Sequence, residues 1–203
     1  MPKSNYGCKR WSKAMLTALN NIAPLKRIID VGPGIGTYTS FRQPGQQWVG
    51  VEVWAPYVRT YELEKKYDQV VVADIRYLDW SQFTPVDVVI FGDILEHMAK
   101  EEAVKVVDRA LRVARVALIS VPVVESIQDE LEGNPFERHV KTDWTNEEVW
   151  NTFPDICTNM LESYIGAYLL SRSPGDRYLI GQIAAKYVPS GATVVQTAAI
   201  QPG

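Results

Sequence analysis

One glycine-rich turn constrains the fold of this chain more than any other part of the sequence. The segment 27–36 reads Arg-Ile-Ile-Asp-Val-Gly-Pro-Gly-Ile-Gly, so an apolar run is followed by glycine at positions 32, 34 and 36. The apolar run predicts a buried parallel strand. Gly32, Gly34 and Gly36 let the backbone turn sharply and approach a ligand closely, because no Cβ stands in the way. Asp30 adds a hydrogen-bond acceptor at the carboxyl end of the strand, where open α/β sheets bind ligands.

The spacing of the glycines separates two kinds of nucleotide-binding turn. A dinucleotide fingerprint has the form G-x-G-x-x-G and would need glycine at position 37 if it began at Gly32. Position 37 is a threonine. A nicotinamide-dependent oxidoreductase is therefore the weaker interpretation, although it shares the alternating fold. A tight turn that binds nothing is the remaining alternative.

Short apolar runs alternate with helical patterns through the first 120 residues. The expected strands are Ile28–Val31, Trp48–Val53, Gln69–Ala73, Val86–Phe91 and Arg115–Val121. Amphipathic or capped helices are expected over residues 8–22, 56–66 and 100–113. Alternation of this kind predicts parallel βαβ units and a doubly wound α/β sheet.

The second part of the chain begins with a long polar segment, residues 125–143, which has the length typical of functional or mobile loops. Residues 156–163 and 167–171 predict a terminal hairpin, and residues 177–187 fit either a helix or a further strand. We expect one domain over residues 1–188 and a flexible tail over residues 189–203.

Composition excludes several functional classes. The chain has 203 residues, a formal net charge of -3 and a pI near 5.5, whereas dedicated nucleic-acid-binding domains carry basic surfaces. No apolar run is long enough to cross a bilayer and no signal-peptide core is present, so a cytoplasmic protein is expected. Cys8 and Cys157 lack metal-ligand spacing, and no metal site is expected.

Two acids follow the second and third expected strands. Glu52 lies 20 residues after Gly32, where a carboxylate can accept hydrogen bonds from both hydroxyls of a ribose. Asp74 and Ile75 follow the third strand, where the carboxylate can accept from an adenine amino group and Ile75 can pack on the ring. The alternatives are a surface acid that closes a strand and an Asp that caps a helix.

Candidate groups for chemistry follow the fourth and fifth expected strands. The run Gly-Asp-Ile-Leu-Glu-His ends at residue 97, and Asp93 and His97 share a face if the segment is helical. His97 and, in the segment 134–144, His139 are candidate proton acceptors, because histidine titrates near neutrality. Both histidines also fit purely structural roles.

Taken together, these motifs resemble the class I S-adenosylmethionine (SAM) dependent methyltransferases of the small-molecule type. The matching residues are Asp30–Gly36 as D-x-G-x-G-x-G, Glu52, Ala73–Ile75, Gly92–His97 as G-D-x-L-E-H, and the loop 134–144. The resemblance covers roughly residues 25–172 and implies a mostly parallel seven-stranded sheet whose last strand is antiparallel.

This resemblance implies a role for each residue of the motifs. Gly32, Gly34 and Gly36 would wrap the methionine part of SAM, and Asp30 would hold its amino group. Glu52 would bind the ribose, Asp74 and Ile75 the adenine, and the Asp93 backbone would face the methionine end. Asp93, His97 and His139 are the candidate catalytic residues.

Some features depart from the family pattern. Pro44 stops the first crossover helix early, and the motifs of amino-directed and cytosine C5 DNA methyltransferases are missing. A small-molecule or sugar-type acceptor is therefore expected, a nucleic-acid partner is disfavoured, and no membrane partner is expected. A non-catalytic binding module of the same fold is a further alternative. The sequence leaves the acceptor atom and the oligomeric state open.

Overall fold

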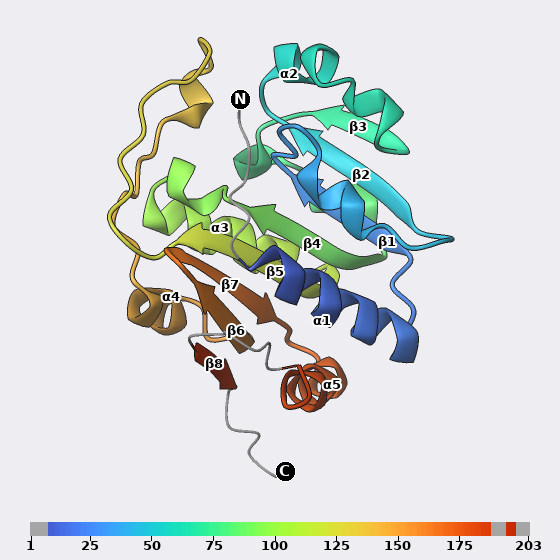
Figure 1. The fold of residues 1–203 in the computed structure, drawn as a ribbon. Coiled ribbons are helices and arrows are strands. Elements are labelled where there is room, and N and C mark those ends of the chain that lie inside the picture. Colours follow the sequence, from blue (N-terminus) through green and yellow to red (C-terminus); the bar gives the residue numbers. More distant parts are fainter. Residues whose placement is uncertain (1–7, 188–193, 198–203) are drawn as a thin grey trace.

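The computed structural model describes residues 8–187 and 194–197, and they form one eight-stranded sheet with helices on both faces (Figure 1). The strand order is β3-β2-β1-β4-β5-β7-β6-β8. The strands are β1 Arg27–Val31, β2 Gln47–Glu52, β3 Gln69–Val72, β4 Val86–Gly92, β5 Ala114–Pro122, β6 Ile156–Glu162, β7 Ile165–Leu170 and β8 Val194–Thr197.

The first five strands are parallel, and the last three pair in antiparallel fashion. β7 lies between β5 and β6, so the terminal hairpin is built into the sheet. The predicted doubly wound, mostly parallel sheet with an antiparallel hairpin is confirmed.

The eighth strand was not expected. It pairs with β6 within residues 189–203, where a flexible tail was predicted, and the rest of that tail lies outside the described residues. The run Val-Val-Gln-Thr at 194–197 is rich in β-branched residues, and β6 would otherwise be an edge strand with unpaired backbone groups.

The helices divide between the two faces of the sheet. The α-helices are α1 Lys9–Ile22, α2 Ala55–Thr60, α3 Lys100–Ala110, α4 Asn146–Thr152 and α5 Pro174–Ala184. Buried residues of α1 and α5 share a core with Ile28 and Ile90, whereas those of α3 and α4 share a second core with Ile29 and Val89. Neighbouring strand residues point to opposite faces, which explains the two cores.

Three helical segments differ in detail from the prediction. The segment after the glycine turn is only a 3₁₀ helix, η1 Thr37–Phe41, and it ends before Pro44 as expected. The helix expected over residues 56–66 ends at Thr60 and resumes as a 3₁₀ turn, η2 Leu63–Lys65, because Glu62 adopts a left-handed φ of 50°. The undecided segment 177–187 falls mainly in helix α5, whose first turn is capped by Ser173.

Over residues 8–187 and 194–197, every helix is too short or too polar to cross a lipid bilayer.

Candidate active site

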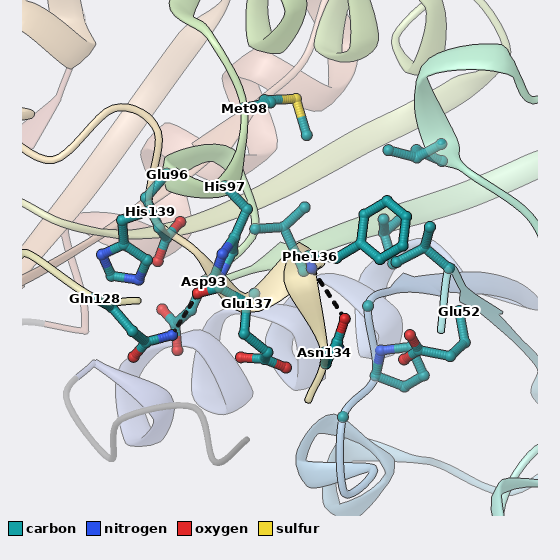
Figure 2. Close-up of a pocket in the computed structure, with 18 of the residues that line it drawn as sticks. Glu52, Asp93, Glu96, His97, Met98, Gln128, Asn134, Phe136, Glu137 and His139 are labelled. Atoms are coloured by element: carbon teal, nitrogen blue, oxygen red, sulfur yellow. Dashed lines mark hydrogen bonds between the residues drawn. The ribbon is translucent and has the colours of Figure 1, made fainter. Parts of the chain in front are cut away.

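A cavity of about 400 Å³ opens at the carboxyl ends of the parallel strands (Figure 2). This volume is within the range of pockets that bind small organic ligands. Its wall includes the turns after β1, β2, β3 and β4, the segment 126–139 that follows β5, and the turn between β6 and β7. The cavity therefore lies at the carboxyl ends of the strands, where the sequence predicts a ligand-binding site.

The glycine turn forms one side of this cavity. Gly32, Gly34 and Gly36 all have positive φ, at 58°, 53° and 80°. The Gly32 N–H donates to the Val51 carbonyl at 2.8 Å, which fixes the turn to β2. Gly32 and Gly34 line the cavity, whereas Gly36 does not; a Cβ at Gly36 would lie 2.9 Å from Cδ of Lys66.

Asp30 lies beneath the turn and is only 1% exposed, so it does not line the cavity. Its Oδ2 accepts a hydrogen bond of 2.5 Å from the Tyr67 hydroxyl, while its buried Oδ1 has no partner. Burial raises the pKa of Asp30 to about 7. The structure therefore places an ionisable carboxyl with a free acceptor below the glycine turn.

Glu52 ends β2 and lines the cavity, although only 3% of its surface is exposed. Its Oε1 accepts from the Trp54 N–H at 2.8 Å. Burial raises the pKa of Glu52 to about 7, because a charged carboxylate loses hydration there. The buried Glu52 carboxyl at the end of β2 can accept hydrogen bonds from a polar ligand in the cavity.

Asp74 and Ile75 form the wall after β3. Asp74 caps the 3₁₀ turn η3 Ile75–Tyr77 by accepting a hydrogen bond from the Arg76 N–H at 2.9 Å. It therefore has the capping role that the sequence offered as an alternative to adenine binding. Asp74 also pairs with the Arg76 guanidinium at 2.6 Å. Ile75 belongs to the hydrophobic core and presents part of its side chain to the cavity.

Asp93 follows β4 in a left-handed conformation, with a φ of 58°. Its N–H donates to the Ser120 carbonyl, and its Oδ1 accepts from the Ser120 hydroxyl, both at 2.8 Å. Its Oδ2 lies 3.9 Å from the ammonium nitrogen of Lys9, a buried residue of α1. These contacts fix the carboxylate at the end of β4.

His97 and His139 lie side by side at one end of the cavity, although 41 residues separate them along the chain (Figure 2). Their ring centroids are 4.8 Å apart in an edge-to-face arrangement. Leu95–His97 is a single 3₁₀ turn, η5, rather than part of an α-helix. Burial, with a smaller contribution from His139, lowers the pKa of His97 to about 4. His97 is therefore neutral at pH 7 and a weak proton acceptor.

The polar segment 125–143 forms the outer wall of the cavity. The N–H groups of Val140 and Lys141 both donate to the Glu96 carbonyl, at 2.8 and 3.0 Å. Nearer its tip, Asn134 caps the 3₁₀ turn η6 Pro135–Glu137, and Phe136 contacts Trp54 with ring centroids 6.2 Å apart. The segment thus extends from the β4 turn to the β2 side, as the yellow coil in Figure 1 shows.

Two acids in the cavity wall had no role in the sequence analysis. Glu96, whose side chain is 2% exposed, has a pKa raised well above its usual value by burial and by Asp93. Glu137 comes from the outer wall, and burial also raises its pKa. The signal for Glu96 was an acid placed directly before a histidine in an apolar turn. Glu137 had no local signal, because its position depends on the path of the long segment.

Comparison with known proteins identifies the fold. No protein-family model matches the sequence, and a search of curated proteins finds no match. Solved structures do match. The N-terminal domain of EvdMO1 with S-adenosylhomocysteine (SAH) bound aligns with a TM-score of 0.60 and 18% identity, over 83% of each chain. The chain has the fold of class I SAM-dependent methyltransferases.

Two further methyltransferase structures are similar to this chain. Magnesium protoporphyrin IX methyltransferase (ChlM) from Synechocystis PCC 6803 with bound SAM has a TM-score of 0.59 and 19% identity, over 81% of this chain and 77% of that one. The small RNA methyltransferase HEN1 has a TM-score of 0.59 and 16% identity, over 85% of this chain and 26% of its own. The same fold thus serves substrates of very different size.

The packing of Tyr38 beneath the turn after β4 leaves no room for a side chain at Gly92. A Cβ there would lie 2.1 Å from Cε2 and 2.8 Å from Cζ of Tyr38, whose ring is 3% exposed and has little room to move. We expect Gly92→Ala to lower the free energy of unfolding by about 1–3 kcal/mol, the usual cost of overpacking. Denaturant unfolding measures the change.

Gly175→Ala is the matched control. It lies in α5, where a Cβ would meet only the Ser173 Oγ at 3.8 Å. Replacing glycine by alanine where the backbone conformation suits both residues raises the free energy of unfolding by about 0.4–1 kcal/mol. Equal stabilities of the two variants would contradict the close packing of Tyr38 against Gly92.

Proposed function

We propose that this protein is a SAM-dependent methyltransferase that acts on a small-molecule or sugar-type acceptor. The observation that carries the proposal is that the glycine turn, Glu52 and Ile75 line one cavity at the carboxyl ends of β1, β2 and β3. These residues supply close backbone approach, a buried carboxylate and an apolar surface. A nucleoside joined to an amino acid needs all three.

The donor set fits the parts of SAM one by one. Glu52 would accept from the two ribose hydroxyls, Ile75 would pack on the adenine, and Asp74 would accept from its amino group. Gly32 and Gly34 would surround the methionine part. The unpartnered Oδ1 of Asp30 is an acceptor for the amino group, directly or through a water, because Asp30 lies below the cavity surface.

When bound, SAM supplies a methyl group on a sulfonium, a good leaving group, so positioning of the acceptor accounts for most of the catalysis. Asp93, His97 and His139 lie at the end of the cavity away from Glu52 (Figure 2). The Asp93 carboxylate, fixed by Ser120, can hold or take a proton from an acceptor. His97, with a pKa of about 4, is better suited to hold a ligand than to take a proton.

Several observations favour a small acceptor over a nucleic acid. The net charge of -3 gives no general attraction to phosphates. Among the similar structures, the EvdMO1 N-terminal domain was also crystallised in the presence of SAH and D-fucose, and MmcR is a mitomycin 7-O-methyltransferase. HEN1 acts on small RNA, which keeps a nucleic-acid acceptor as a second candidate.

Two other functions share this geometry. An NAD-type oxidoreductase also needs an acid after β2, but its fingerprint requires a glycine at position 37, where this chain has Thr37. A non-catalytic binding module would bind SAM without transferring the methyl group. A comparison of SAH binding with NADH binding distinguishes the methyltransferase from the oxidoreductase. Methyl transfer to a panel of acceptors distinguishes it from the non-catalytic module.

One test of the proposal concerns Glu52. Isothermal titration calorimetry of the purified protein should detect SAH binding, and Glu52→Gln should weaken it by about 10- to 100-fold, since a hydrogen bond to a charged group contributes about 1.5–3 kcal/mol. Glu64→Gln, at an exposed acid outside the cavity, should leave the affinity unchanged. Failure of the wild type to bind SAH at millimolar concentration, or preference for NADH, would overturn the proposal.

A separate test of the proposal concerns pH. Glu52 and Asp30 each have a pKa near 7 without ligand, and the ligand contacts require the ionised forms. SAH affinity should therefore rise from pH 6 to pH 8, by up to about tenfold per unit for each group below its pKa. In the unliganded protein the sign is opposite: the folded state holds these protons more tightly, so the free energy of unfolding falls as pH rises from about 4 to 7.

In Glu52→Gln, SAH affinity should rise less steeply with pH, because only the ionisation of Asp30 still contributes to the rise. A pH-independent affinity of the wild type between pH 6 and 8 would rule out ionised Glu52 and Asp30 as ligand contacts.

A further inference from the structure

A group of three potential metal ligands occupies one end of the cavity. Glu96, His97 and His139 each offer a ligand atom, and these atoms lie within 4.8 Å of one another. The two histidines are the only ones in the chain. Glu96 and His97 come from the turn after β4 and His139 from the segment after β5, and Figure 2 shows them converging. The two segments thus bring nitrogen and oxygen ligand atoms from distant parts of the sequence around one point.

The backbone sets the orientation of both imidazoles. Nδ1 of His97 lies 3.2 Å from the Arg138 carbonyl, and Nδ1 of His139 lies 2.7 Å from the Ser126 carbonyl. A carbonyl only accepts, so each Nδ1 carries the proton and donates it. Each Nε2 then keeps its lone pair. This is the arrangement of metal-binding histidines, which donate the other ring N–H to a carbonyl or carboxylate.

The carboxyl of Glu96 is an independent observation that points to a cation. Its side chain is 2% exposed and lines the cavity, yet the buried Oε2 has no hydrogen-bond partner. An unsatisfied buried polar atom costs about 1–3 kcal/mol, more for a charged group. The position of Glu96 is nevertheless fixed, because its carbonyl accepts from both Val140 and Lys141. A bound cation would supply the missing partner.

We propose that Glu96, His97 and His139 bind a divalent first-row transition-metal ion. Two imidazoles and one carboxylate suit Zn²⁺, Mn²⁺, Fe²⁺ or Co²⁺ better than Mg²⁺ or Ca²⁺, which prefer oxygen ligands only. Two atoms each about 2.1 Å from one ion are at most about 4.2 Å apart, so binding draws the three side chains together. The sequence predicted no metal site, because Cys8 and Cys157 lack metal-ligand spacing.

A consequence for the acceptor rests on the proposed function. Three protein ligands leave coordination positions for water or for an oxygen atom of another molecule. The ion would lie at the end of the cavity away from Glu52, where we place the acceptor. An acceptor hydroxyl bound there would be oriented and would lose its proton more easily.

The test uses metal-free protein, prepared by dialysis against a chelator, and titrates it with Zn²⁺ by calorimetry and with Co²⁺ by visible absorption. We expect one ion per chain with a micromolar or lower dissociation constant and a Co²⁺ spectrum typical of nitrogen and oxygen ligands. Glu96→Gln and His139→Ala should each weaken binding by at least about 100-fold, more than the loss of a supporting contact.

Glu52→Gln is the matched control, because it changes an equally buried glutamate at the other end of the same cavity. It should lose SAH affinity and keep the metal, whereas Glu96→Gln should lose the metal and keep SAH, so the two proposals fail separately. His139→Gln replaces His139→Ala if the unfolding midpoint of the latter falls. Absence of a stoichiometric ion in the wild type, or unchanged affinity in the folded Glu96 and His139 variants, would overturn the metal site.

Discussion

The parallel register of β1, β2 and β4 is the constraint on which the rest of this structure depends. Val31 pairs with Val51 on one side and with Phe91 on the other, so these strands end at the same level. The turns that follow them, beginning at Gly32 and at Asp93, therefore open onto one cavity. Hydrogen bonds from Gly32 to Val51 and from Asp93 to Ser120 extend the register into the turns.

This constraint divides the cavity into two parts with different origins. The part near Glu52 is built by strand ends, and Glu52 itself is the last residue of β2. The other part joins the β4 turn to a coil that has little regular structure, and it is held by backbone bonds from Val140 and Lys141 to the Glu96 carbonyl. Under the proposed function, a donor site built on strand ends would lie beside an acceptor site built on coil, which suits a fold that serves many substrates.

The predictable features were local ones. An apolar run before the glycines predicted β1, and alternation of strands and helices predicted the parallel sheet. The two runs at 156–163 and 167–171 predicted the hairpin. The contact between His97 and His139 is not local, because it depends on the path of residues 125–143 across the cavity. A polar coil has no hydrophobic periodicity from which that path could be predicted. Asp30 was correctly placed at the end of β1, but its bond to Tyr67 and its position below the cavity surface required the packed structure. Strand β8 was missed because its pairing depends on the free edge of β6.

A crystal structure of the protein with SAH tests the central claim most directly. The account predicts the ribose hydroxyls at the Glu52 carboxylate, the adenine against Ile75, and the homocysteine part along Gly32 and Gly34. The sulfur would then face the end of the cavity that holds Asp93, His97 and His139. Density for SAH elsewhere, or in this cavity with the ribose away from Glu52, would contradict it.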